Sequence, residues 1–199
     1  MDGTLTPVRS TWRYLHDAFG TWQLGKLLAD QYYAGAIDYG TWAQRDAELW
    51  RGIKRDEVEE IMKQIPYYEG AVETICGLRW AGLRVGLVSA GIEFLASRVE
   101  RELGMDFAVA NQLLCHKGRL TGEVVVKVSL ENKVQVMRRI ADEGALSLDD
   151  CATIGDTAYD LPTESGLRIA FNPSDLKTRQ IANVTVEGSN LQTVLQYII

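Results

Sequence analysis

Few residues in this chain are suited to forming disulfide bonds or binding soft metal ions. It has three cysteines and two histidines in 199 residues. Cys76, Cys115 and Cys151 are odd in number and far apart in the sequence, so we expect reduced thiols rather than a disulfide framework. Cys76 and Cys151 stand among apolar residues, which predicts that they are small core residues.

Long apolar runs and an excess of basic charge are also missing. No apolar run approaches the roughly 20 residues that span a bilayer, and no signal-peptide pattern is present. The formal net charge is −6, whereas proteins that bind nucleic acid usually present a basic face. We therefore expect a cytoplasmic protein whose main partner is neither nucleic acid nor a membrane. The sequence leaves monomer and homodimer open.

The chain changes character near Pro66. Between residues 8 and 65, apolar residues recur at helical spacing and no strand is evident, which predicts a small helical unit. After Pro66, the run "LRVGLVS", a helix and the run "FAVAN" make a strand-helix-strand unit, which is typical of parallel sheet. The residues around Lys117 and Gly118 predict a β-hairpin. Further strands are expected at "CATIGD", "LRIAFN" and "NVTV", and a helix at "NLQTVLQYII".

Three polar residues stand where strands of this sheet would end or begin. Ser89 follows "VGLV", Asp156 follows "ATIG", and Asp2 opens the chain. Ligands of open α/β sheets bind at the carboxyl ends of the strands. Each residue alone is more typical of a turn or a helix cap. Their joint appearance, with Lys133 near a helix start, indicates a site.

These motifs resemble those of the haloacid dehalogenase superfamily of phosphatases, in its phosphoserine phosphatase-like branch. "MDGTLT" matches the first motif, Asp-x-Asp-Gly-Thr, without its first Asp. "VGLVSAG", "LENKVQ" and "IGDTAYD" match the second, third and fourth motifs at Ser89, Lys133, Asp156 and Asp160. The resemblance covers about Pro66 to the C-terminus, together with Asp2 to Thr6.

The resemblance implies an α/β fold. Its Rossmann-like core would have a mainly parallel sheet and a β-hairpin flap, formed by residues 1–7 and 67–199. Residues 8–66 would form a small helical cap inserted after the first motif. The activity it implies is Mg²⁺-dependent hydrolysis of a small phosphorylated metabolite through an aspartyl-phosphate intermediate.

The charge of the substrate explains the residue types. A phosphate monoester carries about two negative charges at neutral pH, so cations must offset its repulsion of a carboxylate nucleophile. By the resemblance, Lys133 and a Mg²⁺ ion held by Asp156, Asp160 and the Asp2 carbonyl supply them. Ser89, Ala90 and Gly91 would bind the phosphoryl oxygens together with Lys133. Asp2 would act as catalytic acid and base.

The nucleophile of the family would lie two residues before Asp2, just upstream of Met1. We therefore expect the chain as printed to be impaired in catalysis. Three explanations stay open. Translation begins upstream and Met1 is the middle residue of the first motif, or the chain is an inactive relative that binds a phosphorylated metabolite or a protein partner, or a neighbouring chain or vector-derived residues fill the place of the missing strand. Loss of a central strand would also leave a slot with two free edges in the sheet.

Two charged residues bear on substrate choice. In the family, a cap Glu holds the ammonium of phosphoserine and a cap Arg its carboxylate. A gap-free alignment puts Arg9 and Asp46 at these positions, which reverses both charges; a shift of one residue would put Arg45 at the second. We expect a substrate other than phosphoserine. Arg9 and Asp46 would read the substrate or pair with each other, unless both are solvated surface charges.

Overall fold

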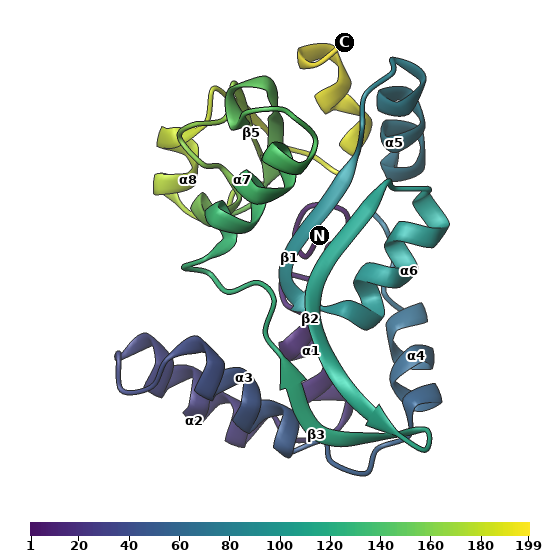
Figure 1. Cartoon of the computed structure of the whole chain (residues 1–199), viewed down its shortest axis with the longest axis vertical. Helices are drawn as coiled ribbons and strands as arrows, with labels where there is room; N and C mark the ends of the chain where they lie inside the picture. The colour runs from purple at the N-terminus through teal and green to yellow at the C-terminus, as the bar shows by residue number, and fades with distance from the viewer.

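The computed structural model describes all 199 residues. The first third of the chain is helical, with α1 (Thr11–Ala18), α2 (Trp22–Tyr33), α3 (Tyr39–Glu48) and α4 (Arg55–Lys63). The helices α2 and α3 form a hairpin that projects from the rest of the molecule (Figure 1). Ser10 and Asp38 cap α1 and α3 by accepting hydrogen bonds from Arg13 N–H and Thr41 N–H, as expected of these side chains.

Six strands form two three-stranded sheets rather than one continuous sheet. In the first sheet, β1 (Gly86–Ile92) is parallel to β2 (Phe107–His116), and β2 is antiparallel to β3 (Arg119–Val125). In the second, β4 (Ala152–Gly155), β5 (Leu167–Phe171) and β6 (Val184–Val186) are all parallel. β1 and β4 each lie at an edge of their sheet. The α/β class with mainly parallel strands is confirmed.

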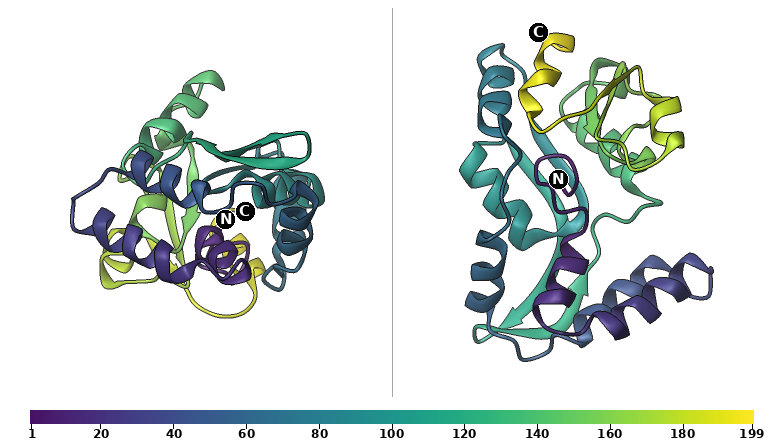
Figure 2. Two further views of the ribbon diagram at one scale, coloured as in Figure 1. Left: turned by 90° about the horizontal axis from the view of Figure 1, so that it is seen from below. Right: turned by 180° about the vertical axis from the view of Figure 1, so that it is seen from behind.

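The remaining helices pack on these sheets. They are α5 (Ala71–Trp80), α6 (Glu93–Leu103), α7 (Lys133–Glu143) and α8 (Leu176–Ile181), with short 3₁₀ turns η1 (Leu148–Asp150), η2 (Ala158–Asp160) and η3 (Leu191–Tyr197). The predicted C-terminal helix is therefore a 3₁₀ segment. Figure 2 shows the second sheet, α7 and α8 as a lobe beside β1, with the N-terminus close to β1. No helix combines the length and apolar character needed to cross a membrane.

The predicted β-hairpin is present and its turn has the expected chemistry. Lys117 and Gly118 both have positive φ, 47° and 73°, as a type I′ turn requires. The segment "FAVAN" continues into this hairpin, so β2 is longer than expected.

One hydrophobic cluster of 27 buried residues runs from the helical segment into both sheets. It includes Trp50, Met62, Ile92 and Phe171, none more than 1% exposed. The separation of residues 8–66 as a cap therefore rests on the projecting hairpin and stays a prediction. The expectation for two cysteines was wrong, because Cys76 is exposed on the outer face of α5 and Cys151 is only partly buried. All three thiols are free.

Candidate active site

The first motif packs directly against the fourth. Gly3 has a φ of 68°, and a Cβ atom there would lie 2.2 Å from Asp156 Oδ2. Only glycine can therefore occupy this position while the carboxylate keeps its place. The backbone of the first motif therefore lies against the Asp156 carboxylate.

Asp2 is held by the start of α1. Its Oδ2 accepts hydrogen bonds from the Thr11 N–H at 2.8 Å and the Thr11 hydroxyl at 2.7 Å, while its Oδ1 is buried without a partner. Burial raises the pKa of Asp2, although the bonds from Thr11 oppose this shift. A carboxyl group with a raised pKa and one free oxygen is suited to carrying a proton.

The phosphate-binding residues expected at the end of β1 lie beside Asp2. A Cβ atom at Gly91 would lie 3.0 Å from Asp2 Oδ2. The Gly91 N–H donates to the buried Ser89 hydroxyl oxygen at 3.0 Å. The carbonyl of Ala90, between them, accepts from Trp12 Nε1 at 3.0 Å, the Tyr39 hydroxyl at 2.7 Å and Asn111 Nδ2 at 2.8 Å. These three donors fix the orientation of the Ala90 peptide group within β1.

Lys133 and Asp160 complete the cluster. The Lys133 ammonium bonds to Asp160 Oδ1, and both side chains are largely buried. The other oxygen of Asp160 accepts from the Thr157 N–H and hydroxyl at 3.0 and 2.6 Å. Burial alone would raise the pKa of Asp160, but the Lys133 charge and these hydrogen bonds hold it below its ordinary value. Asp160 is therefore ionised at neutral pH.

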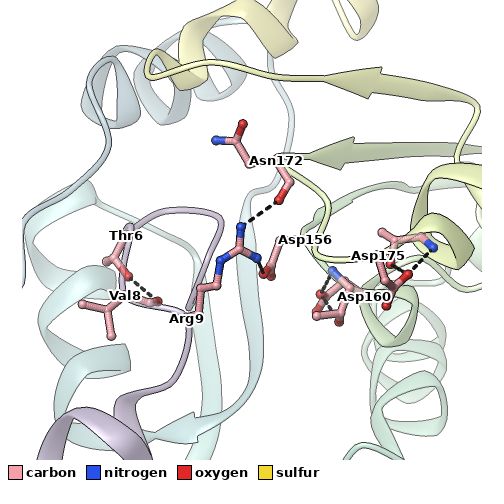
Figure 3. A network of polar contacts seen from close by, with 9 residues as sticks. Thr6, Val8, Arg9, Asp156, Asp160, Asn172 and Asp175 are labelled. Carbon is pink, nitrogen blue, oxygen red and sulfur yellow. Dashed lines mark hydrogen bonds and ion pairs between the residues drawn. The ribbon is translucent and has the colours of Figure 1, made fainter. Parts of the chain in front are cut away.

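Asp156 lies between a cation and a second carboxylate. Its Oδ2 is 3.2 Å from Arg9 Nη1, and the Arg9 guanidinium also donates to the Asn172 carbonyl at 3.4 Å (Figure 3). Burial and the nearby charge of Asp160 raise the pKa of Asp156 to about 6. Two neighbouring carboxylates that repel each other are the kind of oxygen donors that a hard cation stabilises.

The structure contains no group of three or more His, Cys, Asp or Glu side chains placed to hold a metal ion. The Asp2 carboxylate is held by Thr11. Asp156 and Asp160 supply oxygen donors of the kind that a hard cation takes, and the expected metal roles of both residues and of the Asp2 carbonyl stay predictions.

The two residues expected to read the substrate lie apart. Arg9 contacts Asp156, whereas Asp46 is 2% exposed and its Oδ1 is 3.1 Å from His16 Nε2. The alternative in which Arg9 and Asp46 pair with each other is therefore wrong, and Asp46 is not a solvated surface charge, whereas Arg9 is exposed but paired with Asp156. Asp46 lies inside the helical segment because it shares the buried face of α3 with Ala43 and Ala47.

Some residues at the site were not expected from the sequence. Thr11, Tyr39 and Asn111 fix Asp2 and Ala90 through the hydrogen bonds described above. Asn111 is fully buried and also accepts from the Lys127 and Val128 N–H groups, both at 2.9 Å. A polar residue directly after the apolar run 107–110 was the available signal, since such a residue is buried only with hydrogen-bond partners.

Comparison with known proteins decides the family. The model of haloacid dehalogenase-like hydrolases matches residues 1–163. This chain belongs to that family. A phosphoserine phosphatase of Methanocaldococcus jannaschii is 31% identical over 176 residues, which cover 87% of this chain and 83% of that protein. One from Idiomarina loihiensis is 32% identical over 164 residues, covering 81% and 74%.

The solved structures agree with this assignment. A phospho-aspartyl intermediate analogue of phosphoserine phosphatase superposes with a TM-score of 0.83 at 28% identity, covering 99% of this chain and 95% of that one. A substrate-bound phosphoserine phosphatase complex gives the same TM-score and identity. The chain is thus of the phosphoserine phosphatase-like branch, a group of phosphoric monoester hydrolases.

Proposed function

We propose that this protein is a Mg²⁺-dependent phosphatase that hydrolyses the monoester of a small phosphorylated metabolite, with Asp2 as general acid and base. The observation that carries the proposal is the convergence of five predicted residues. Contacts or charge interactions link Asp2 to Gly91, the adjacent Gly3 to Asp156, Asp156 to Asp160, and Asp160 to Lys133. The proposal assigns the roles of acid, cation and phosphate-binding group to these neighbouring residues.

In hydrolysis, the bond between phosphorus and the ester oxygen breaks, and the alcohol oxygen takes up a proton. Asp2 would donate that proton, because its raised pKa favours the protonated form. It would then accept one from the water molecule that supplies the new oxygen of phosphate. Lys133, the Ser89 hydroxyl and the Gly91 N–H would bind the phosphoryl oxygens.

Asp156, Asp160 and the Asp2 carbonyl would hold the Mg²⁺ ion. When bound, the ion offsets the charge of the phosphate dianion. Arg9 would leave Asp156 in this state, because its side chain is 55% exposed and held by long contacts.

The proposed nucleophile is an Asp immediately before Met1, at the end of a strand between β1 and β4. Support comes from the first motif of the family, in which the nucleophilic Asp stands two residues before the position of Asp2, and from β1 and β4, which each lie at an edge of their sheet.

An extended chain tests this proposal. We would add, directly before Met1, an apolar strand that ends in Asp, and compare it with a chain that ends in Asn there. The Asp form should hydrolyse p-nitrophenyl phosphate only with Mg²⁺, and the Asn form should be at least about 10³-fold slower. Equal rates for the two forms, or no activity in either, would contradict the enzyme mechanism.

A binding protein without catalysis is the second candidate. The ion pair between Arg9 and Asp156 favours it, because a guanidinium neutralises the carboxylate that would face the metal ion. Inactivity of both extended chains, with binding of inorganic phosphate retained, would support this candidate.

The relatives are named for phosphoserine, but we propose a different substrate. Arg9 stands where the branch has a Glu for the substrate ammonium, and Asp46 is buried on His16. By the gap-free alignment, neither charge would serve phosphoserine as the Glu and Arg of the branch would, whereas a shift of one residue would put Arg45 at the second position.

A further inference from the structure

A cavity of about 640 Å³ opens between the helical hairpin and the core. On the hairpin side it is lined by residues at the end of α2 and the start of α3, among them Tyr32, Tyr33 and Tyr39. On the core side it is lined by residues before α7 and by Tyr159 of η2. We call this cavity the tyrosine pocket. Its volume falls within the range of about 300–1,000 Å³ that is usual for small-molecule sites.

The tyrosine pocket adjoins the phosphate end of the active site. The Tyr39 hydroxyl donates to the carbonyl of Ala90, the residue between Ser89 and Gly91. Asn132 and Tyr159, both in the lining, directly precede Lys133 and Asp160 in the chain. A substrate with its phosphate at Ser89 and Lys133 would therefore place its alcohol portion in this pocket.

The lining combines aromatic rings with negative charge. Four of its twelve residues are tyrosines, its charged residues are Asp38 and Glu131, and it contains no Lys, Arg or His. Tyr33 and Tyr159 are 72% and 49% exposed, so their rings are open to a ligand. Tyr32 is fixed by stacking on Trp42, with ring centroids 4.6 Å apart.

Both carboxylates are ionised at neutral pH. The Thr41 N–H lowers the pKa of Asp38. Burial opposes ionisation of Glu131, but hydrogen bonds from the Tyr32 hydroxyl and from Ser129 outweigh it and lower its pKa. Aromatic faces and carboxylates both attract cations, and both repel a carboxylate on the ligand.

We propose that the tyrosine pocket binds the leaving-group end of the substrate, and that this end carries a substituted ammonium group and no carboxylate. The inference rests on the proposed function, since it assumes that the phosphate lies at Ser89 and Lys133. A quaternary ammonium fits best, because its charge is spread over methyl groups that contact tyrosine rings and need no hydrogen-bond acceptor. A primary ammonium would instead need several acceptors in a fixed geometry.

Binding of choline by the full chain tests the proposal without catalysis. Calorimetry would compare choline with 3,3-dimethyl-1-butanol, which has the same shape but no charge, and with serine. Choline should bind at least about tenfold more tightly than either. Equal or tighter binding of the neutral alcohol would show an uncharged apolar pocket, and tighter binding of serine would show an amino-acid site; both results overturn the proposal.

Matched variants locate the binding site. Tyr33→Leu removes an open ring and Glu131→Gln removes a charge, and each should weaken choline binding about threefold to tenfold. The controls make the same changes elsewhere, at the partly exposed Tyr197 and at Glu187, which pairs with Arg179. Tyr197→Leu and Glu187→Gln should leave choline affinity unchanged. Equal effects of the pocket and control variants would contradict the assignment.

Choline binding and the activity of the extended chain together distinguish a wrong substrate class from a wrong catalytic mechanism. If the chain extended with the nucleophile hydrolyses p-nitrophenyl phosphate but the protein does not bind choline, the substrate class is wrong and the phosphatase stands. If choline binds as expected but no extended chain is active, the pocket stands and the proposed catalysis fails.

Discussion

Two buried acid–base pairs, one in each half of the molecule, differ in the direction in which the pKa of the aspartate is shifted. Lys133 and Asp160 lie at the edge of the sheets with side chains 7% and 13% exposed. His16 and Asp46 lie between α1 and α3 with side chains 2% exposed. The pKa of Asp160 is held below its ordinary value, whereas burial raises the pKa of Asp46 above it.

The number of well-placed donors explains this difference. Asp160 accepts hydrogen bonds from the Lys133 ammonium and from both the N–H and the hydroxyl of Thr157. Asp46 Oδ1 is 3.1 Å from His16 Nε2, but neither atom makes a hydrogen bond of good geometry. The lowered pKa of Asp160 thus accompanies several donors that replace the lost water, and the raised pKa of Asp46 accompanies their absence.

Removing the lysine should have the largest effect. Lys133→Met would leave the ionised Asp160 buried without its cation, and should lower the free energy of unfolding by about 3–5 kcal/mol. Urea denaturation in the presence of EDTA would measure this loss without contributions from bound metal. The control is Lys63→Met, since the pair of Lys63 with Glu60 is exposed and should contribute little to the free energy of unfolding. A similar loss in both variants would contradict the comparison.

Removing the histidine should cost less, because Asp46 can take up a proton when its partner is lost. We expect His16→Met to lower the free energy of unfolding by about 1–3 kcal/mol, measured in the same way. His116→Met, at an exposed position next to the hairpin turn, is the control and should change stability by about 0.5 kcal/mol or less.

A double variant tests whether the pair of His16 and Asp46 contributes to stability. His16→Met with Asp46→Leu replaces the pair by apolar side chains and should recover most of the loss, as expected when a weakly bonded buried pair is replaced. A double variant less stable than His16→Met alone would show that the pair stabilises the helical segment.

The fold could be predicted well where local patterns decide it. The turn at Lys117 and Gly118 and the strands at β1, β4 and β5 follow from local chemistry, and the structure confirms them. The division into two sheets could not be read from local periodicity, because strand partners depend on contacts between segments distant in sequence. The exposed Cys76 was missed because the apolar residues around it on α5 do not show which face of the helix packs inward.

The phosphate end of the site was predictable from its motifs, but Ser89, Ala90 and Gly91 lie within β1 rather than after it, and only Asp156 directly follows its strand. The partner of Asp46 was not predicted, although a signal was present. Tyr39, Ala43, Asp46, Ala47 and Trp50 recur at three- and four-residue spacing and are all buried. A carboxylate on an apolar helix face needs a buried partner. The family alignment instead suggested that Asp46 contacts the substrate, so a buried partner was not predicted.

The smallest expected effect is a difference in the pH dependence of stability. A raised folded-state pKa means that Asp46 stabilises the folded protein fully below its ordinary value of 3.8, and that this contribution is lost as pH rises through the folded-state pKa. For Asp160, whose pKa is lowered, the contribution is present above 3.8 and is lost as pH falls. Relative to Asp46→Asn, the unmodified protein should therefore lose free energy of unfolding with rising pH, whereas relative to Asp160→Asn it should gain. Urea denaturation in EDTA between about pH 3 and pH 7 measures both slopes, and repeating the first comparison in the His16→Met background removes the imidazole titration. Slopes of the same sign would show that donor number does not distinguish these two carboxylates.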